Sequence, residues 1–278
     1  MAALMSRPLI LVTNDDGIDS PGLAAAAGAL DALGDLLIVA PATQQTSMGR
    51  SRSERGERDG RIQTATVSLG ARRWPGFAVN ATPAMTVEYA LQALAPRPVQ
   101  LVVSGINHGE NVGTCVTASG TIGAALEGAE RGVRAMAVSL EVPDSQYFEH
   151  AEAAAFEPAM HFITLFAGAS LGRAWPADVD VLKIEIPATA TRETGWRVTR
   201  QDRFAYYQPT LPAVDLDFSL PSRMVHRPAK GQFSREGTDT FALAQGLVSV
   251  TPLSLDLTSR VTMREVEALF DPPASAEQ

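Results

Sequence analysis

The chain has 278 residues, of which 45% are hydrophobic, so it can bury the core of one large α/β domain or of two smaller ones. Its formal net charge of −8 argues against a general nucleic-acid-binding surface, because phosphate backbones select clustered Lys and Arg. The single cysteine, Cys115, excludes an intramolecular disulfide and a cysteine-based zinc cage. Leu9–Val12 is too short for the apolar region of a secretory signal, and no apolar run approaches membrane-spanning length. We therefore expect a cytoplasmic protein with no membrane partner.

The sequence alternates between strand-like and helix-like segments. Apolar runs of strand length lie at Leu9–Val12 and Leu36–Ala40, and an Ala- and Leu-rich helix, Leu23–Leu33, lies between them. We expect further strands at Val99–Val103, Ala135–Leu140, Val181–Ile186 and Leu247–Thr251, and further helices at Pro83–Leu94, Ile122–Arg131, Phe148–Ala167 and Arg260–Phe270. Strands that alternate with helices predict an α/β protein with a mostly parallel sheet.

Two segments depart from this alternation. Ala42–Arg73 is polar, and Ser51–Arg61 within it is dense in mixed charge. It is either a loop that attracts phosphate or a solvated loop or hairpin, and the interspersed acidic residues favour the second. From Thr194 to about Gly237, aromatic residues and arginines crowd together before a Pro-containing polar stretch. We expect β-hairpin arms there.

The first predicted strand ends at Asn14-Asp15-Asp16-Gly17. Two adjacent carboxylates repel each other, and a divalent cation would remove that cost. Asp and Asn oxygens are hard ligands, which suit Mg²⁺, Mn²⁺ or Ca²⁺. The alternative is that these residues only form a polar turn.

Two more polar loops, Ala42–Gly49 and Ser104–Gly113, follow predicted parallel strands, at the edge of the sheet where α/β proteins bind ligands. Their neutral oxygen donors are Thr46, Ser47 and Asn107. Ser119-Gly120-Thr121 starts a predicted helix, whose N-terminal amides favour phosphate, although Ser119 could act only as an N-cap. A cation beside an anion pocket indicates phosphoester hydrolysis.

At these residues the chain resembles the survival protein E (SurE) family of metal-dependent nucleotidases. The matching segments are Leu11–Ile18, Val39–Pro41, Thr82–Ala84, Val103–Gly113, Ser119–Gly128 and Gly195–Gln201. They occur in the family's order and span most of the chain. The Asn-Asp-Asp-Gly and Ser-Gly-x-Asn-x-Gly-x-Asn-x-Gly motifs are specific when they occur together.

The resemblance implies a Rossmann-like, three-layer α/β/α fold with a mostly parallel central sheet, as one domain over residues 1–278. The core would occupy residues 1–190. A β-hairpin arm, a returning strand and a terminal helix would occupy residues 191–278. The resemblance also implies that C-terminal elements are exchanged between subunits, in a homodimer or homotetramer.

The implied activity is hydrolysis of nucleoside 5′- and 3′-monophosphates by a metal-activated water, with one Mg²⁺ or Mn²⁺ per subunit. The implied metal ligands are Asp15, Asp16, Asn107 and Thr46, with Ser47 as the alternative to Thr46. Asp15 and Asp16 would also be catalytic. The implied phosphate-binding residues are Asn14, Asn107, Asn111, Ser119, Gly120 and Thr121, although Asn14 could instead cap its turn.

Two other functions remain open at this level. One is a broad-specificity phosphatase or exopolyphosphatase, which would need extra cationic contacts such as Arg50 or Arg52. The other is a non-catalytic nucleotide-binding member of the fold, which the Thr at position 46 favours. The chain also departs from the family at Glu185, where members carry Asn, so its substrate preference is open.

Overall fold

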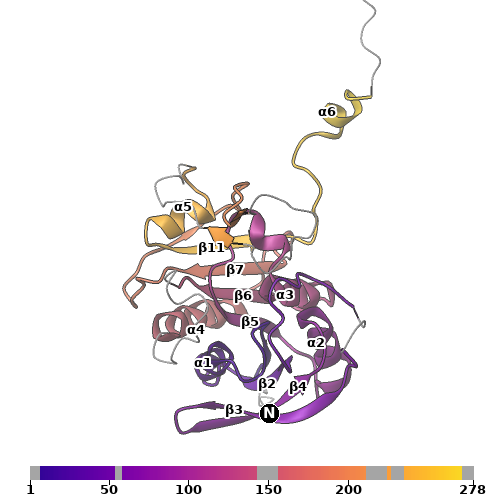
Figure 1. Cartoon of the computed structure of the whole chain (residues 1–278), viewed down its shortest axis with the longest axis vertical. Coiled ribbons are helices and arrows are strands. Elements are labelled where there is room, and N and C mark those ends of the chain that lie inside the picture. The colour runs from indigo at the N-terminus through magenta and orange to yellow at the C-terminus, as the bar shows by residue number, and fades with distance from the viewer. Residues whose placement is uncertain (1–6, 54–57, 143–155, 211–223, 227–234, 271–278) are drawn as a thin grey trace, which may run out of the picture.

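The computed structural model describes residues 7–53, 58–142, 156–210, 224–226 and 235–270 (Figure 1). The described residues form a main sheet in the strand order β3-β4-β2-β1-β5-β6-β7-β11-β8. Its strands are β1 Leu9–Thr13, β2 Asp35–Pro41, β3 Ile62–Leu69, β4 Arg72–Val79, β5 Leu101–His108, β6 Ala135–Leu140, β7 Val181–Ile186, β8 Trp196–Val198 and β11 Val248–Leu253. A second, antiparallel sheet pairs β9 Gln208–Thr210 with β10 Met224–His226.

The α-helices are α1 Pro21–Leu30, α2 Pro83–Tyr89, α3 Gly120–Glu130, α4 Glu157–Leu171, α5 Asp239–Ala244 and α6 Met263–Glu267. A π-helical turn, η1 Ala90–Leu94, continues α2, and a 3₁₀ turn, η2 Gly113–Thr117, precedes α3. Ser20, Thr82 and Ser119 each accept a first-turn N–H as the N-cap of α1, α2 and α3, and the capping predicted for Ser119 is confirmed. Among the described residues, no helix is long and apolar enough to cross a membrane.

The strands β4, β2, β1, β5, β6 and β7 run parallel to one another, whereas β3 pairs antiparallel with β4 and β11 pairs antiparallel with β7. From β1 the chain passes through α1 to β2 on one side, and it later reaches β5 on the other side of β1. The strand order therefore reverses between β1 and β5. In an open α/β sheet, the crevice at the carboxyl ends of such a strand pair is where ligands bind.

Both faces of the central strands are buried. Ile10 and Val12 of β1 belong to one hydrophobic cluster, with residues of α1 and α4, whereas Leu9 and Leu11 belong to a second cluster, with residues of α2 and α3. Figure 1 shows α1 and α4 on one side of the sheet and α2 and α3 on the other. Burial on both faces explains why β1 is a continuous apolar run, and the predicted three-layer α/β/α architecture is confirmed.

The end of the predicted polar segment, from Ile62 to Arg73, lies in the antiparallel hairpin of β3 and β4, so the hairpin interpretation is confirmed for this part only. β4 also pairs in parallel with β2 and thereby extends the central sheet, which the sequence did not indicate. β5 runs on to His108, with an irregularity between Ser104 and Asn107, so Asn107 lies near the end of a strand rather than in the loop that we predicted.

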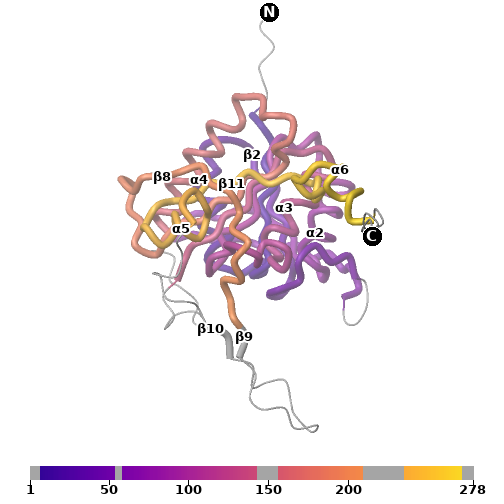
Figure 2. Tube along the Cα trace, turned by 90° about the horizontal axis from the view of Figure 1, so that it is seen from above, coloured from indigo at the N-terminus to yellow at the C-terminus, as the bar shows by residue number. Residues whose placement is uncertain are grey.

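The C-terminal part differs in detail from the expectation. The Trp196 segment pairs with β11 as the edge strand β8 of the main sheet, and the β-hairpin pairing lies later, at β9 and β10. The short helix α5 was not predicted. The expected helix Arg260–Phe270 is helical only over Met263–Glu267 and buries no residue, and Figures 1 and 2 show α6 following the end of β11. Part of the expected helix Phe148–Ala167, residues 148–155, lies outside the described residues.

Candidate active site

Asn14 follows β1 and closes the turn that carries the two aspartates. Its side-chain nitrogen donates to the Gly17 carbonyl at 3.0 Å and to the Ser20 hydroxyl at 2.9 Å. Its side-chain oxygen accepts the Gly17 N–H at 3.2 Å, and Gly17 has a φ of +99° that favours glycine. Asn14 therefore shapes the turn, and its predicted contact with phosphate stays a prediction.

Asp15 is buried at the N-terminus of α3. Its Oδ1 accepts a hydrogen bond from the Thr121 hydroxyl at 2.6 Å, and the Thr121 backbone N–H also stabilises the carboxylate. Burial and, to a lesser extent, the negative charge of Asp16 raise the pKa of Asp15 to about 7, against the lowering effect of these hydrogen bonds. A nearby cation would stabilise the charged form of both aspartates, so the two residues fit a divalent metal ion.

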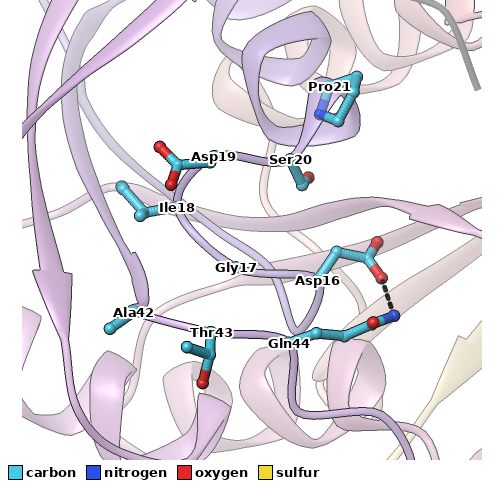
Figure 3. Close-up of a pocket in the computed structure, with 9 residues that line it drawn as sticks. All are labelled: Asp16, Gly17, Ile18, Asp19, Ser20, Pro21, Ala42, Thr43 and Gln44. Carbon is cyan, nitrogen blue, oxygen red and sulfur yellow. Dashed lines mark hydrogen bonds between the residues drawn. The ribbon is translucent and has the colours of Figure 1, made fainter. Parts of the chain in front are cut away.

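Asp16 is half-buried beside Asp15, and both of its oxygens have protein contacts. The Gln44 side-chain nitrogen donates to Oδ1 at 3.3 Å, as Figure 3 shows, and the His108 backbone N–H donates to Oδ2 at 3.3 Å. These contacts link Asp16 to the loop after β2 and to the end of β5. Asp16 lies in the first of the three predicted polar loops and is hydrogen-bonded to the other two.

The loop after β2 is tied to the aspartates through its backbone. The Gln45 N–H donates to the Asp15 carbonyl at 2.7 Å, and the Gly49 N–H donates to the Ala118 carbonyl, just before α3, at 3.0 Å. Thr46 and Ser47 form the exposed corner of a turn closed by the Met48 N–H on the Gln45 carbonyl at 3.3 Å. Both hydroxyls are therefore on the loop that borders Asp15, and the choice between them as a ligand stays open.

Asn107 completes the neutral oxygen donors of the predicted metal site, at the end of β5. Its side-chain nitrogen donates to the Gly109 carbonyl at 2.6 Å. Because that bond fixes the nitrogen, the amide oxygen is the atom that could coordinate a cation. Within the described residues there is no group of three or more His, Cys, Asp and Glu side chains that could hold a metal ion. A metal here would depend on two carboxylates and neutral oxygens, as hard cations allow.

The phosphate-binding segment predicted at the start of α3 has its side chains partly engaged within the protein. Ser119 caps the helix by accepting the Ile122 N–H at 3.2 Å. Gly120 has no room for a side chain, because a Cβ atom would lie 2.7 Å from Asp15 Oδ2. The helix N-terminus and the Asp15 carboxylate are therefore in contact. The sequence predicts the first in a phosphate pocket and the second in an adjoining metal site.

Asn111 lies farther along the glycine-rich loop and is hydrogen-bonded to residues of β6 and β7. Its side-chain nitrogen donates to the Ser139 hydroxyl at 3.1 Å, and its backbone N–H donates to Glu185 Oε2 at 2.8 Å. The Lys183 ammonium donates to the Asn111 carbonyl at 3.0 Å. Asn111 thus shapes the loop, and its predicted contact with phosphate stays a prediction.

Three fully buried charged residues, Lys183, Glu185 and Asp239, form what we call the buried ionic cluster. Lys183 Nζ lies 2.9 Å from Asp239 Oδ2 and 3.6 Å from Glu185 Oε1. Asp239 Oδ2 also accepts the Gly113 N–H at 3.1 Å. Burial raises the pKa of Glu185 to about 7, although the Lys183 charge and the Asn111 N–H lower it.

The sequence did not reveal this cluster as part of the site. Lys183 and Glu185 alternate with apolar residues on strand β7, and this alternation could have indicated a buried pair of opposite charges. Asp239 is the first residue of α5, and Thr238 before it is an N-cap that could have indicated this helix. The Gly195–Gln201 motif also gains an explanation, because the Gln201 side chain donates to the Gly113 carbonyl at 3.0 Å.

The arginines that could have bound extended phosphate chains are engaged elsewhere. Arg50 Nε lies 3.1 Å and Arg52 Nη2 lies 2.8 Å from the fully buried Glu127 carboxylate. Glu130 contacts both arginines, with Arg52 Nη2 at 2.6 Å. We expected acidic residues within the charged segment to neutralise its arginines, whereas the partners of Arg52 lie on α3.

The fold and the site together define a Rossmann-like α/β protein with an acidic, oxygen-rich site at the switch point of a parallel sheet. The family model of survival protein SurE matches residues 10–208, and the chain belongs to that family.

Similar proteins include the 5′-nucleotidase SurE of Archaeoglobus fulgidus, 38% identical over 266 residues, with 94% of this chain and 97% of that protein covered. The 5′-nucleotidase SurE of Thermococcus gammatolerans is 37% identical over 265 residues, with 93% and 94% covered. The crystal structure of the SurE protein from Aquifex aeolicus matches with a TM-score of 0.74 and 30% identity, over 95% of this chain and 100% of that chain.

Proposed function

We propose that this chain is a metal-dependent 5′-nucleotidase that hydrolyses nucleoside monophosphates to nucleoside and phosphate, with the 3′-monophosphates as further substrates. The observation that carries the proposal is the position of Asp15 and Asp16 at the carboxyl end of β1, where Asp15 meets the N-terminus of α3 and Asp16 accepts the backbone N–H of His108, the residue after Asn107. Membership of the SurE family and the names of the relatives support it.

In this proposal Asp15, Asp16 and Asn107 hold one divalent cation, Mg²⁺ or Mn²⁺, and Thr46 supplies the fourth protein ligand, with Ser47 as the alternative. Such a cation, when bound, polarises a phosphoryl oxygen and makes a water more acidic. One of the two aspartates also orients the attacking water and accepts its proton. Burial and, to a lesser extent, the charge of Asp16 raise the pKa of Asp15 to about 7, and a cation bound nearby would offset this cost of ionisation.

The phosphate of the substrate binds at the start of α3, at Ser119, Gly120 and Thr121, and beside Asn107. Amides at a helix N-terminus stabilise negative charge such as that of the phosphoryl oxygens. Asn14 and Asn111 act indirectly in this proposal, because their side chains are bonded within the turn and to Ser139. They keep the two loops in place around the phosphate.

The exopolyphosphatase alternative finds less support, since Arg50 and Arg52 pair with Glu127 and Glu130 instead of facing a substrate. The non-catalytic alternative rests on Thr46 alone. A threonine hydroxyl can coordinate a cation as a serine hydroxyl does, so this substitution does not argue against catalysis.

Phosphate release from a panel of nucleoside 5′- and 3′-monophosphates and polyphosphate tests the proposal, after chelation and after Mn²⁺ or Mg²⁺ is restored. Asp16→Asn is expected to lower the metal-dependent rate by a factor of about 100 or more, since it removes one charged ligand. Asp35→Asn, on the exposed amino end of β2, is the matched control and is expected to match the unmodified protein. A folded protein that releases no phosphate with either metal would favour the non-catalytic alternative.

We also propose that residues 1–278 act as one domain in a cytoplasmic protein, and that the C-terminal part joins subunits in a homodimer or homotetramer. Apolar side chains on that part support the assembly: Leu257 is 88% exposed, Leu269 76% and Phe270 81%. Exposed apolar groups of this size on a projecting segment are typical of an interface.

A further inference from the structure

A cavity of about 530 Å³ opens beside Asp16, between the turn after β1 and the loop after β2 (Figure 3). Its lining residues are Asp16, Gly17, Ile18, Asp19, Ser20, Pro21, Ala42, Thr43 and Gln44. Its volume is within the roughly 300–1,000 Å³ typical of small-molecule sites. Because Asp16 belongs to the candidate metal site, a molecule in this cavity would lie next to the reacting phosphate.

The lining combines apolar side chains with neutral and acidic groups. Ile18, Pro21 and Ala42 give apolar surface on two sides, and Thr43 and Gln44 add a hydroxyl and an amide. Asp19 adds a second carboxylate to the lining, on the side of Ile18 and away from the Asp16 carboxylate (Figure 3), and no Lys or Arg is among the described lining residues. The cavity therefore favours a neutral ligand with hydrogen-bond donors and disfavours an anionic one.

Among the described residues of the neighbouring polar segment, three arginines are bonded to other partners and do not compensate for these carboxylates. Arg50 and Arg52 pair with the buried Glu127 on α3. Arg58 donates to the Gln45 side-chain oxygen at 3.1 Å and also contacts Met48. All three partners lie outside the lining of the cavity.

We propose that this cavity is the nucleoside subsite, and that Asp19 determines the preference for a nucleoside monophosphate over polyphosphate. The assignment rests on the proposed nucleotidase function. The apolar side chains pack against the base, and the Asp19 carboxylate accepts hydrogen bonds from ribose hydroxyls or from the amino group of a base. The same carboxylate repels the second and third phosphates of an extended chain.

Nucleoside binding to the metal-free protein tests the subsite separately from catalysis. Adenosine, guanosine, cytidine and uridine are titrated in a calorimeter against the unmodified protein, Asp19→Ala and the control Asp35→Ala. At least one nucleoside is expected to bind, about tenfold more weakly to Asp19→Ala and unchanged to Asp35→Ala, as loss of a hydrogen bond to a charged group implies. Absence of binding by all four, or equal binding to Asp19→Ala, would overturn the assignment.

Substrate selection gives the second readout. Asp19→Lys is expected to raise kcat/KM for tripolyphosphate relative to the preferred nucleoside monophosphate by a factor of about 10 or more. Inhibition by inorganic phosphate, which occupies only the phosphate position, is expected to be the same in Asp19→Ala and in the unmodified protein. An unchanged selection ratio in Asp19→Lys would contradict the role of Asp19.

The two proposals fail in different ways. If a nucleoside binds in an Asp19-dependent manner but no phosphomonoester is hydrolysed with any metal, the subsite stands and the nucleotidase function falls. If nucleoside monophosphates are hydrolysed but Asp19→Ala changes neither nucleoside binding nor the KM, the nucleotidase function stands and the subsite falls.

Discussion

At the scale of single residues, the site depends on how closely Asp15 approaches the first turn of α3. The Thr121 hydroxyl and backbone N–H bind the carboxylate, and Gly120 leaves the space that the side chain occupies. A carboxylate at a helix N-terminus is stabilised by the helix dipole. The helix therefore both positions Asp15 and offsets part of the cost of burying its charge.

Gly120→Ala tests that close approach. The added Cβ would lie 2.7 Å from Asp15 Oδ2 and 2.8 Å from Asp15 Cβ, so the aspartate must move. We expect metal affinity and kcat to fall by a factor of about 10 or more, as displaced ligand geometry usually causes. Metal titration and phosphate release measure both.

Gly168→Ala on α4 is the matched control for that change. The nearest atom to its added Cβ is 3.7 Å away, so the alanine fits. Activity is expected to stay the same, and the free energy of unfolding to rise by about 0.5–1 kcal/mol, because alanine is the better helix former. Equal activity of the Gly120 and Gly168 variants would contradict the role assigned to Gly120.

The fourth ligand can be assigned by removing each candidate hydroxyl without changing the loop. Thr46→Val keeps the side-chain shape, and Ser47→Gly suits the left-handed backbone of Ser47, whose φ is +61°. If Thr46 coordinates the cation, Thr46→Val weakens metal binding by a factor of about 10 or more and Thr46→Ser restores it. Calorimetric titration with Mn²⁺ measures this, and a loss confined to Ser47→Gly would assign the ligand to Ser47.

At the scale of elements, the buried ionic cluster joins β7 and α5 to the glycine-rich loop of the site. Lys183 binds the Asn111 carbonyl and Asp239, and Asp239 binds the Gly113 N–H. These bonds satisfy buried charges that would otherwise be costly. The conformation of the loop beside Asn107 is therefore set by residues of two elements that do not contribute predicted ligands.

Lys183→Met removes the only cation of that cluster and leaves two carboxylates buried together. We expect the free energy of unfolding to fall by about 3–5 kcal/mol, as measured for broken buried ion pairs. Urea denaturation measures this change. Arg97→Met, which breaks the surface pair with Asp35 at 2.7 Å, is expected to cost less than about 1 kcal/mol. If both variants lost the same stability, the cluster would not have the energetic role assigned to it.

The pH dependence of stability gives a test of Glu185. Its pKa is about 7 in the folded protein, against a usual value of 4.5, so between these values the folded state retains a proton that the unfolded chain has lost. This contribution to stability is present below pH 4.5 and is lost as the pH rises to about 7, and it amounts to roughly 3 kcal/mol.

Glu185→Gln carries no titratable group at this position, so its stability is expected to fall less steeply with pH across that window. Urea unfolding at a series of pH values compares the two proteins. The pKa of Asp15 is also raised, but Asp15 is present in both proteins, so its contribution cancels when their stabilities are subtracted. Parallel stability curves for the two proteins would contradict the raised pKa of Glu185.

At the scale of the whole molecule, the main hydrophobic clusters form without the segment that follows β11. The described residues of these clusters extend to Leu253, whereas α6 buries no residue. The apolar side chains beyond Asp256 therefore contribute little to the packing of one subunit. Their exposure is explained if they pack against a second copy of the chain.

A chain that ends at Asp256 tests this role of the C-terminal segment. We expect it to remain folded, because no described residue of 257–270 is buried, and to be monomeric at concentrations where the full chain is an oligomer. Light scattering after size-exclusion chromatography measures the mass. Phe270→Ser in the full chain, which changes one 81%-exposed side chain, should weaken the assembly to a smaller degree. An unchanged oligomer in the truncated protein would contradict the assignment.

The sequence by itself determined the mostly parallel α/β sheet and predicted the residues of the candidate site. Apolar runs such as Leu9–Thr13 are strands buried on both faces, and capping residues such as Ser119 mark helix starts, because both signals act locally along the chain. The polar residues at the carboxyl ends of β1, β2 and β5 predicted one site, since parallel strands end at a common edge.

Only the tertiary structure decided which distant residues meet. The placement of β4 beside β2 and of β8 beside β11 depends on pairing between strands far apart in sequence. Likewise, Lys183 and Asp239 are 56 residues apart, and neither carries a local sign of the partner that neutralises it. The cavity beside Asp19 lies between the turn after β1 and the loop after β2. The residue types of these two segments do not determine how closely the segments approach each other.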